Sequence, residues 1–195
     1  ADKGKTGRAR PGHALIHIQG RTVPMKKELI ANPDNCTGCN RCTYICSAVK
    51  EGAIMPSMAR IKVSNIPFRG YSVPHICFHC PKADCMEACS AGAFSRNDAG
   101  VVIINAEKCN ACGACVQACT YGMVEQDSAG IAYKCDLCDG DPACVRECHA
   151  EALIHVTPNP GTLQLKAAQM KSRTRSGTPR EKRRQMADRL LKSAR

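Results

Sequence analysis

The chain has 195 residues, including 16 cysteines but only three Phe, four Tyr and no Trp. So few aromatic side chains exclude a core built mainly on large rings, and a chain of this length then needs additional cross-links. The formal net charge is +11. It is divided unevenly, because residues 1–30 carry +5 and residues 166–195 carry +9, whereas residues 31–165 carry −3. The sequence therefore predicts an acidic body between two basic ends.

Residues 1–30 are expected to form a basic N-terminal extension with a strand. Glycine and basic residues predict a mobile arm over residues 1–12. The apolar run His13–Ile18 predicts a strand, and Gln19-Gly20-Arg21 predicts a turn. A polar and basic start argues against a secretory signal peptide, and Glu28–Ala31 predicts a second strand that leads into a cysteine motif.

Four cysteine motifs follow and use all 16 cysteines. The first and third share the spacing C-x2-C-x2-C-x3-C, and consist of Cys36, Cys39, Cys42 and Cys46, and of Cys109, Cys112, Cys115 and Cys119. The second and fourth have a longer middle gap, and consist of Cys77, Cys80, Cys85 and Cys89, and of Cys135, Cys138, Cys144 and Cys148. This alternating order suggests duplication of a two-motif unit.

Three kinds of chemistry compete for these cysteines. A disulfide framework requires a secretory context, which the chain start does not indicate. Zinc prefers paired C-x2-C units that meet in a tetrahedron. A third cysteine two residues further on, present in two motifs, favours an iron–sulfur cubane instead. Four oxidised clusters with their thiolates would carry −8 and would reduce the net charge from +11 to +3.

Short strands are expected between the motifs. Ile61–Val63 predicts one strand, and two strand–turn–strand hairpins are predicted at 93–104 and 123–133. After the last cysteine, Ala152–Val156 resembles the run Ala14–Ile18, so we expect these two segments to be strands of one terminal sheet. Residues 157–195 form a basic C-terminal tail, which we expect to be irregular over 157–178 and helical over 179–193. The helix start is predicted from Thr178 as N-cap, Pro179 and Glu181.

The sixteen-cysteine order resembles the four-cluster, ferredoxin-like electron-transfer subunits of molybdenum, tungsten and nickel–iron redox complexes. Two further segments, Pro56–Val63 and Pro74–Cys80, are similar to the iron–sulfur subunits of tungsten aldehyde oxidoreductases. The resemblance covers roughly residues 30–156. It implies an α+β fold with two bacterial-ferredoxin-like domains, each for two [4Fe-4S] clusters, one nested in the other, with basic N- and C-terminal extensions. The outer domain would span 31–76 and 120–156, and the inner domain 77–119.

The resemblance also implies a ligand set for each of four [4Fe-4S] clusters. Cluster 1 would use Cys36, Cys39, Cys42 and Cys148; cluster 2, Cys77, Cys80, Cys85 and Cys119; cluster 3, Cys109, Cys112, Cys115 and Cys89; and cluster 4, Cys135, Cys138, Cys144 and Cys46. The hairpin linker supports the inner pairing, whereas only the similarity of the terminal strands supports the outer one. The proline that usually follows the fourth cysteine is replaced by Ser47, Ser90, Thr120 and His149. No histidine is needed as a ligand, and His79 is a candidate for a contact behind a cluster or with a partner.

The function implied is electron transfer without a catalytic site, between a catalytic subunit and another redox partner. The catalytic subunit would be a tungsten or molybdenum aldehyde oxidoreductase of anaerobic metabolism, and the other partner a flavin- or NAD-reducing subunit or a ferredoxin. The alternatives are a free soluble polyferredoxin and the small subunit of a formate dehydrogenase or hydrogenase-type complex. A third alternative is a nucleic-acid-binding protein with structural clusters, but the absence of aromatic residues from the basic tail argues against it.

The basic tail itself admits several roles. It is a solvated extension, or it docks on an acidic surface of the catalytic subunit or of another copy of this chain, which would give a head-to-tail assembly. No apolar run reaches the ~20 residues of a membrane span, so we expect a cytoplasmic protein without a membrane segment.

Overall fold

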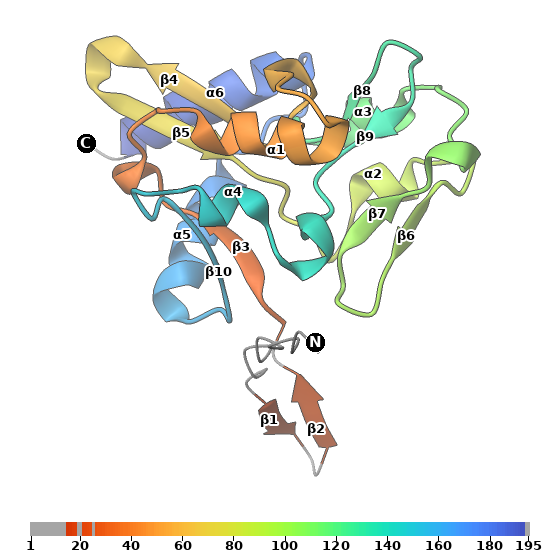
Figure 1. Ribbon diagram of the computed structural model, residues 1–195, viewed down its shortest axis with the longest axis horizontal. Helices are drawn as coiled ribbons and strands as arrows, with labels where there is room; N and C mark the ends of the chain where they lie inside the picture. Colours follow the sequence, from red (N-terminus) through yellow and green to blue (C-terminus); the bar gives the residue numbers. More distant parts are fainter. Residues whose placement is uncertain (1–14, 19–20, 25, 194–195) are drawn as a thin grey trace, which may run out of the picture.

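The computed structural model of the chain describes residues 15–18, 21–24 and 26–193. Its helices are α1 (Arg41–Glu51), α2 (Asp84–Glu87), α3 (Ala114–Ala118), α4 (Ala143–Arg146), α5 (Pro160–Lys171) and α6 (Pro179–Ser193). Its strands are β1 (Leu15–Ile18), β2 (Arg21–Pro24), β3 (Glu28–Ala31), β4 (Lys62–Ile66), β5 (Tyr71–His75), β6 (Phe94–Arg96), β7 (Val102–Ile104), β8 (Glu125–Gln126), β9 (Ala132–Tyr133) and β10 (Leu153–Val156). Short helices and strands alternate along the chain (Figure 1). The mixed helix and strand content agrees with the α+β prediction, while the mobile arm predicted over residues 1–12 lies outside the described residues.

The strands of the described ranges form five separate antiparallel pairs. The pairs β6–β7 and β8–β9 confirm the two hairpins predicted after the second and third cysteine motifs. Polar side chains close both turns: the Asn97 Oδ1 accepts the Val101 N–H at 2.9 Å, and the Asp127 Oδ1 accepts the Ile131 N–H at 2.9 Å. The turn residues chosen by the sequence thus supply the hydrogen bonds that these short hairpins need.

The terminal sheet pairs β10 with β3, in a register that places Ile154 opposite Ile30. The prediction that residues 14–18 would be its other strand is wrong, because β1 pairs with β2 instead. Residues Leu29, Ile30 and Ala31 are buried with Leu153, so the strand that enters the first cysteine motif is also the one that buries the apolar face of β10. The pairing of β10 follows the buried face that it shares with β3, and not its sequence similarity to residues 14–18.

The short helices that follow the cysteine loops pack in two pairs. Helix α1 contacts α4, and helix α2 contacts α3. In Figure 1, α1 and α4 lie close to the β3–β10 pair, whereas α2 and α3 lie near the β6–β7 and β8–β9 hairpins at the other side of the molecule. The first and fourth motifs are therefore neighbours, and so are the second and third.

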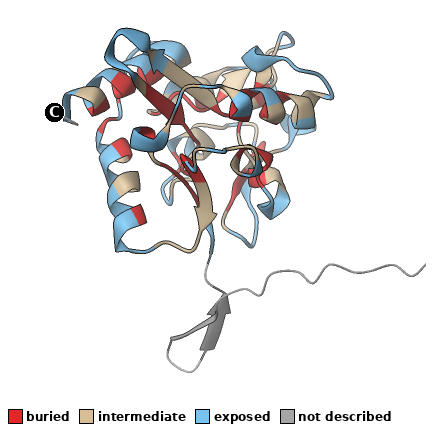
Figure 2. Cartoon of the chain, turned by 60° about the vertical axis from the view of Figure 1, so that its left-hand side comes forward, coloured by how far each residue is buried: buried red, intermediate tan, exposed pale blue. Residues whose placement is uncertain are grey.

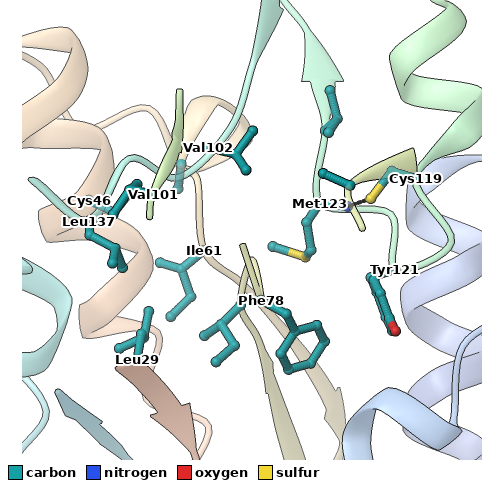
Figure 3. Packing of buried hydrophobic residues seen from close by; sticks show 14 of the residues in the cluster. Leu29, Cys46, Ile61, Phe78, Val101, Val102, Cys119, Tyr121, Met123 and Leu137 are labelled. Carbon is teal, nitrogen blue, oxygen red and sulfur yellow. Dashed lines mark hydrogen bonds between the residues drawn. The ribbon is translucent and has the colours of Figure 1, made fainter. Parts of the chain in front are cut away.

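The core contains small aliphatic residues, a few aromatic rings and cysteines. Phe78 and Tyr121 pack edge to face, with ring centroids 4.8 Å apart, and Met123 lies beside them and close to Cys119 (Figure 3). Such pairs are among the few aromatic contacts that this composition allows. Buried residues lie mainly in the strands and along the inward sides of the helices (Figure 2).

The region 157–178 is more ordered than predicted, because residues 160–171 form helix α5. Its N-terminus carries a capping box: the Asn159 Oδ1 accepts the Thr162 N–H at 3.0 Å, and the Thr162 Oγ1 accepts the Asn159 N–H at 2.8 Å. Pro160 occupies the first helical position, where its missing N–H costs nothing. The prediction of an irregular segment is wrong because Pro160 and Gly161 stand in the first turn of a capped helix, where neither interrupts the hydrogen bonds of the helix.

Helix α6 confirms the predicted helix at 179–193. The Thr178 Oγ1 accepts the Glu181 N–H at 3.3 Å, and the Glu181 carboxylate accepts the Thr178 N–H at 2.8 Å, as the predicted capping box requires. Ala187 and Leu190 pack with Val73 of β5 in a second, smaller apolar cluster. The C-terminal tail is therefore folded onto the body of its own chain over the described residues.

Two ion pairs fasten this tail to the acidic body. The Arg183 guanidinium lies 2.7 Å from a carboxylate oxygen of Glu125, to which Lys62 is also paired at 3.0 Å. Lys166 of α5 lies 2.6 Å from Glu28. Burial alone would raise the pKa of Glu125, but Arg183 and Lys62 together outweigh burial and hold that pKa below its ordinary value. The tail is thus held on its own chain through the carboxylates of Glu125 and Glu28.

Candidate iron–sulfur centres

The four cysteine loops share one backbone feature. The residue just before the second cysteine of each motif has a positive φ, at Gly38 (72°), His79 (46°), Ala111 (59°) and Leu137 (60°). Three of these four residues carry a Cβ and so adopt a left-handed conformation that costs about 1–3 kcal/mol each. Because the same left-handed backbone conformation recurs at the same place in each motif, the four loops share one backbone geometry there, even though their middle gaps differ in length.

Cysteines from the first and fourth motifs come together in two places. One pocket is lined by Cys36, Cys39, Cys42 and Cys148, which we call tetrad 1. A second pocket is lined by Cys46, Cys135, Cys138 and Cys144, which we call tetrad 4, and Cys77 of the second motif lies at the same pocket. In both, three cysteines come from one motif and the last from the other, which is the exchange expected of ferredoxin loops.

The second and third motifs exchange their last cysteines in the same way. Burial raises the pKa of Cys85 to about 12, and the neighbouring thiols of Cys119 and Cys77 raise it further. Burial likewise raises the pKa of Cys115 to about 11, with contributions from Cys109 and Cys89. The thiols of Cys77, Cys80 and Cys119 thus lie around Cys85, and those of Cys89 and Cys109 around Cys115. With Cys112 assigned from its motif, we call the expected sets tetrad 2 (Cys77, Cys80, Cys85 and Cys119) and tetrad 3 (Cys89, Cys109, Cys112 and Cys115).

Backbone N–H groups point at several of these sulfurs. The Sγ atom of Cys46 accepts from Arg60 N–H at 3.2 Å, that of Cys119 from Met123 N–H at 3.3 Å, and that of Cys89 from Ala93 N–H at 3.4 Å. The Sγ atoms of Cys135 and Cys109 accept from Leu137 and Ala132 at 3.4 and 3.5 Å. Such donors stabilise negative charge on sulfur, so the backbone favours thiolates at these positions.

Burial opposes the same charge. It raises the pKa of Cys42 to about 11 and that of Cys135 to about 12, and the pKa of Cys144 is raised further still, for the same reason and by the thiols of Cys135 and Cys46. Thiols in such surroundings stay protonated at neutral pH unless a metal centre takes the place of the protons. The sites therefore suit a bound cationic iron centre better than free thiolates.

The donor sets fit iron–sulfur clusters better than zinc ions. All sixteen cysteines are free thiols, yet no group of three or more His, Cys, Asp or Glu among the described residues is placed to hold a single metal ion. In a cubane each thiolate binds a different iron atom, so the four sulfurs stand further apart than around one zinc ion.

His79 connects the second cysteine loop to a neighbouring strand. Its Nδ1 accepts the Val102 N–H at 3.2 Å, which ties the second loop to strand β7. Burial, together with the charges of Lys134 and Arg96, lowers the pKa of His79 to about 3, so the ring stays neutral. His79 is thus a contact behind the loop, as one of the two alternatives for this residue had it.

Three basic residues near the loops were missed by sequence reasoning. Arg96 donates to the carbonyl oxygens of Cys80 and Pro81 at 2.6 and 3.1 Å, which fixes the second loop. Lys134 and Lys182 are buried, with 7% and 1% of their surface exposed. Lys134 stands directly before Cys135, which is the one signal that the sequence offered.

Comparison with known proteins agrees with this geometry. The family model described as a 4Fe-4S dicluster domain matches residues 68–157, and a 4Fe-4S binding domain matches residues 33–49. The polyferredoxin-like subunit of an aliphatic sulfonate oxidoreductase from Pyrococcus furiosus is 44% identical over 137 residues, which are 67% of this chain and 78% of that subunit. The chain belongs to the polyferredoxin-like [4Fe-4S] subunits of oxidoreductases.

Two further relatives match over much of the chain. The electron transport protein HydN of Escherichia coli is 32% identical over 179 residues, which cover 77% of this chain and 98% of HydN. The beta subunit of the NADH-dependent phenylglyoxylate dehydrogenase of Aromatoleum evansii is 34% identical over 131 residues, although these are only 29% of that subunit. Among the helices that the structure describes, none combines the length and apolar character needed to cross a membrane.

Proposed function

We propose that the chain is an electron-transfer subunit with four [4Fe-4S] clusters, one in each tetrad, and without a catalytic site of its own. What supports this proposal is that cysteines of the first and fourth motifs gather in two pockets, and that thiols of the second and third motifs lie around Cys85 and Cys115. When bound, each cluster supplies a centre that takes up and releases a single electron. Every cysteine of the chain then has a role, and none remains for a disulfide or a nucleophile.

The tetrads follow one another in the order 1, 4, 2, 3. Cys42 of tetrad 1 lies near Cys144 of tetrad 4, and Cys135 of tetrad 4 lies near Cys77 of tetrad 2. Tetrads 2 and 3 are joined by helices α2 and α3, which contact each other. At the two ends of this order, Cys39 and Cys112 are exposed, so we propose that electrons enter at one of these residues and leave at the other.

The chain itself keeps the sites dry and favours negative charge in them. Buried side chains such as Phe78 and Tyr121 cover tetrad 2, and backbone N–H groups donate to Cys46 and Cys119. Burial and sulfur hydrogen bonds are the means by which a protein sets the potential of a cluster.

We also propose the nested arrangement of two ferredoxin-like domains. The contacts of α1 with α4 and the pairing of β3 with β10 support an outer domain over 31–76 and 120–156. The contact of α2 with α3 and the β6–β7 hairpin support an inner domain over 77–119.

A catalytic oxidoreductase subunit is the proposed partner, together with a second redox protein that accepts or supplies the electrons. The relative from Pyrococcus furiosus is named as a subunit of an aliphatic sulfonate oxidoreductase. The segments Pro56–Val63 and Pro74–Cys80, which resemble iron–sulfur subunits of tungsten enzymes, favour a tungsten or molybdenum enzyme as the catalytic subunit, and we place the complex in the cytoplasm.

The experiment that tests this function is an anaerobic reductive titration of the purified holoprotein, followed by a search for partners. The proposal predicts uptake of about four electrons per chain, one for each cluster, no turnover of aldehydes by the chain alone, and co-elution from native extract with a larger subunit that contains tungsten or molybdenum. Elution at the mass of the free chain would instead support a carrier without a fixed partner, and substrate turnover by the isolated chain would overturn the proposal.

A further inference from the structure

The ammonium group of Lys134 is buried without a carboxylate partner. It donates to the carbonyl oxygens of Val102 and of Cys135, the latter at 2.8 Å, and lies 3.5 Å from the Nδ1 of His79. None of these three groups, two carbonyls and an imidazole, carries a negative charge. The seven ion pairs found among the described residues do not include Lys134.

Lys182 of helix α6 is in the same position. It is the largest side chain in the described part of the chain that is fully buried, and its Nζ donates to the carbonyl oxygens of Gln117 and Cys119 at 2.7 and 3.1 Å. These acceptors are again neutral, and no carboxylate among the described residues pairs with this ammonium group. The C-terminal tail thus carries a positive charge into the interior, next to a cysteine of tetrad 2.

Other cations beside the first and fourth motifs are paired with acids. Three such pairs lie beside the first and fourth motifs: Arg60 with Glu51, Lys50 with Asp136 at 2.6 Å, and Arg41 with Glu147 at 2.8 Å. The two buried ammonium groups without a carboxylate partner both reach the surroundings of tetrad 2, Lys182 through the Cys119 carbonyl and Lys134 through His79, although Lys134 also contacts the carbonyl of Cys135 in tetrad 4. Arg96 also contacts this loop through Cys80, but it is exposed and water screens its charge.

An isolated buried ammonium group is costly, and an opposite charge nearby offsets part of that cost. Tetrad 2 provides that charge when it holds a cluster, since an oxidised [4Fe-4S] core with four thiolates carries −2. Lys134 and Lys182 approach the tetrad from different elements, the segment after β9 and helix α6.

We propose that Lys134 and Lys182 are the counter-ions of the tetrad 2 cluster and make it the most easily reduced of the four. The inference rests on the proposed function, because it requires a cluster in tetrad 2. A reduced cluster carries one more negative charge than an oxidised one, so a nearby fixed cation stabilises the reduced form and raises the reduction potential. The electron would therefore rest at tetrad 2, in the interior of the path, rather than at either exposed end.

The test is an anaerobic redox titration of the full-length, cluster-loaded protein, followed by electron paramagnetic resonance. A Cys85→Ser variant identifies the signal of the tetrad 2 cluster. Lys134→Met and Lys182→Met each remove one charge and nearly preserve side-chain volume. We expect each to reduce the ratio of reduced to oxidised tetrad 2 cluster about tenfold at a fixed ambient potential, which corresponds to about 59 mV for one electron.

Two controls separate charge from structural damage. Lys82→Met removes the same charge from the same loop, but Lys82 is exposed, so the tetrad 2 signal should keep its potential. Lys134→Arg retains the charge and should restore most of the potential lost in Lys134→Met. Because the two methionine variants lie on different elements, one remains informative if the other does not fold.

The outcomes distinguish the inference from the function on which it rests. Iron and sulfide analysis that finds no cluster in tetrad 2 would overturn the proposed function itself. Four intact clusters whose tetrad 2 member is not the first to be reduced, or a tetrad 2 potential that neither methionine variant lowers, would overturn the counter-ion proposal alone. A reduction potential of the tetrad 2 cluster that falls equally in Lys82→Met and Lys134→Met would also overturn the counter-ion proposal, since burial of the lysine would then have no part in the effect.

Discussion

Replacing Gly122 by alanine tests how helix α6 is held against the cysteine loops. Gly122 follows Cys119 by three residues, has a φ of 65°, and donates its N–H to the Cys119 carbonyl at 3.2 Å. A Cβ on this residue would lie 2.4 Å from the carbonyl oxygen of Pro179, the first residue of α6. That backbone atom cannot rotate away, so the start of α6 must move.

Gly92 provides a matched control in the second motif. It follows Cys89 by three residues, has a φ of 61°, donates to the Cys89 carbonyl at 3.3 Å, and has no atom within 4 Å of an added Cβ. Both substitutions carry the same left-handed backbone cost of about 1–2 kcal/mol. The difference between the two variants therefore isolates the contact with α6.

The size of the effect follows from what α6 buries. Met186 and Leu190 are 3% and 6% exposed, and full burial of such a side chain is worth about 1.5–3 kcal/mol, so complete detachment of α6 would cost up to about 3–6 kcal/mol for the two. We expect Gly122→Ala to lower the free energy needed to detach α6 by a fraction of this, at least about 1.4 kcal/mol. That is a tenfold change in the equilibrium between detached and docked α6.

Native-state hydrogen exchange measures that equilibrium locally. Amides of α6 should exchange at least about tenfold faster in Gly122→Ala than in the wild type, whereas Gly92→Ala should leave α6 unchanged. Equal exchange of α6 in the two variants would show that α6 does not rest on Gly122, and the account of how the tail is docked would have to be abandoned.

Two further predictions concern cluster assignment and pH. Cys148→Ser should alter the spectroscopic signal of the same cluster as Cys39→Ser, and a different one from Cys138→Ser; a shared signal for Cys148→Ser and Cys138→Ser would contradict the proposed exchange of cysteines between motifs. Burial raises the pKa of Glu125, but Arg183 outweighs burial and holds that pKa below its ordinary value of 4.5. The ionised carboxylate therefore stabilises the folded protein in full above about pH 4.5, and this stabilisation is lost as the pH falls through the lowered pKa. Brief exchange pulses should therefore show α6 opening faster in Glu125→Gln than in the wild type at neutral pH, with the gap closing below about pH 4.5; a gap that widens in acid would reverse the assigned sign.

The cysteine loops were predictable because their determinants are local. Two- and three-residue gaps place thiols around one turn independently of the rest of the chain. The hairpins were predictable for the same reason, because Asn97 and Asp127 are typical turn residues. Helix α6 was likewise announced by its own capping residues, Thr178 and Glu181.

What could not be predicted depends on contacts between distant segments. The similarity of residues 14–18 to 152–156 suggested a strand pair, yet β10 pairs with β3. Ile30 and its neighbours in β3 are buried together with Leu153 of β10. Lysine is almost always a surface residue, so a sequence gives no reason to place Lys182 in the interior. Its burial makes physical sense only once four cysteines gather beside it.

Anaerobic analysis of iron and acid-labile sulfide in the isolated protein tests the central claim most directly. With all sixteen cysteines engaged, the account predicts about 16 iron and about 16 sulfide per chain, four of each for every cluster. A content near half of this, or zinc in place of iron, would contradict it.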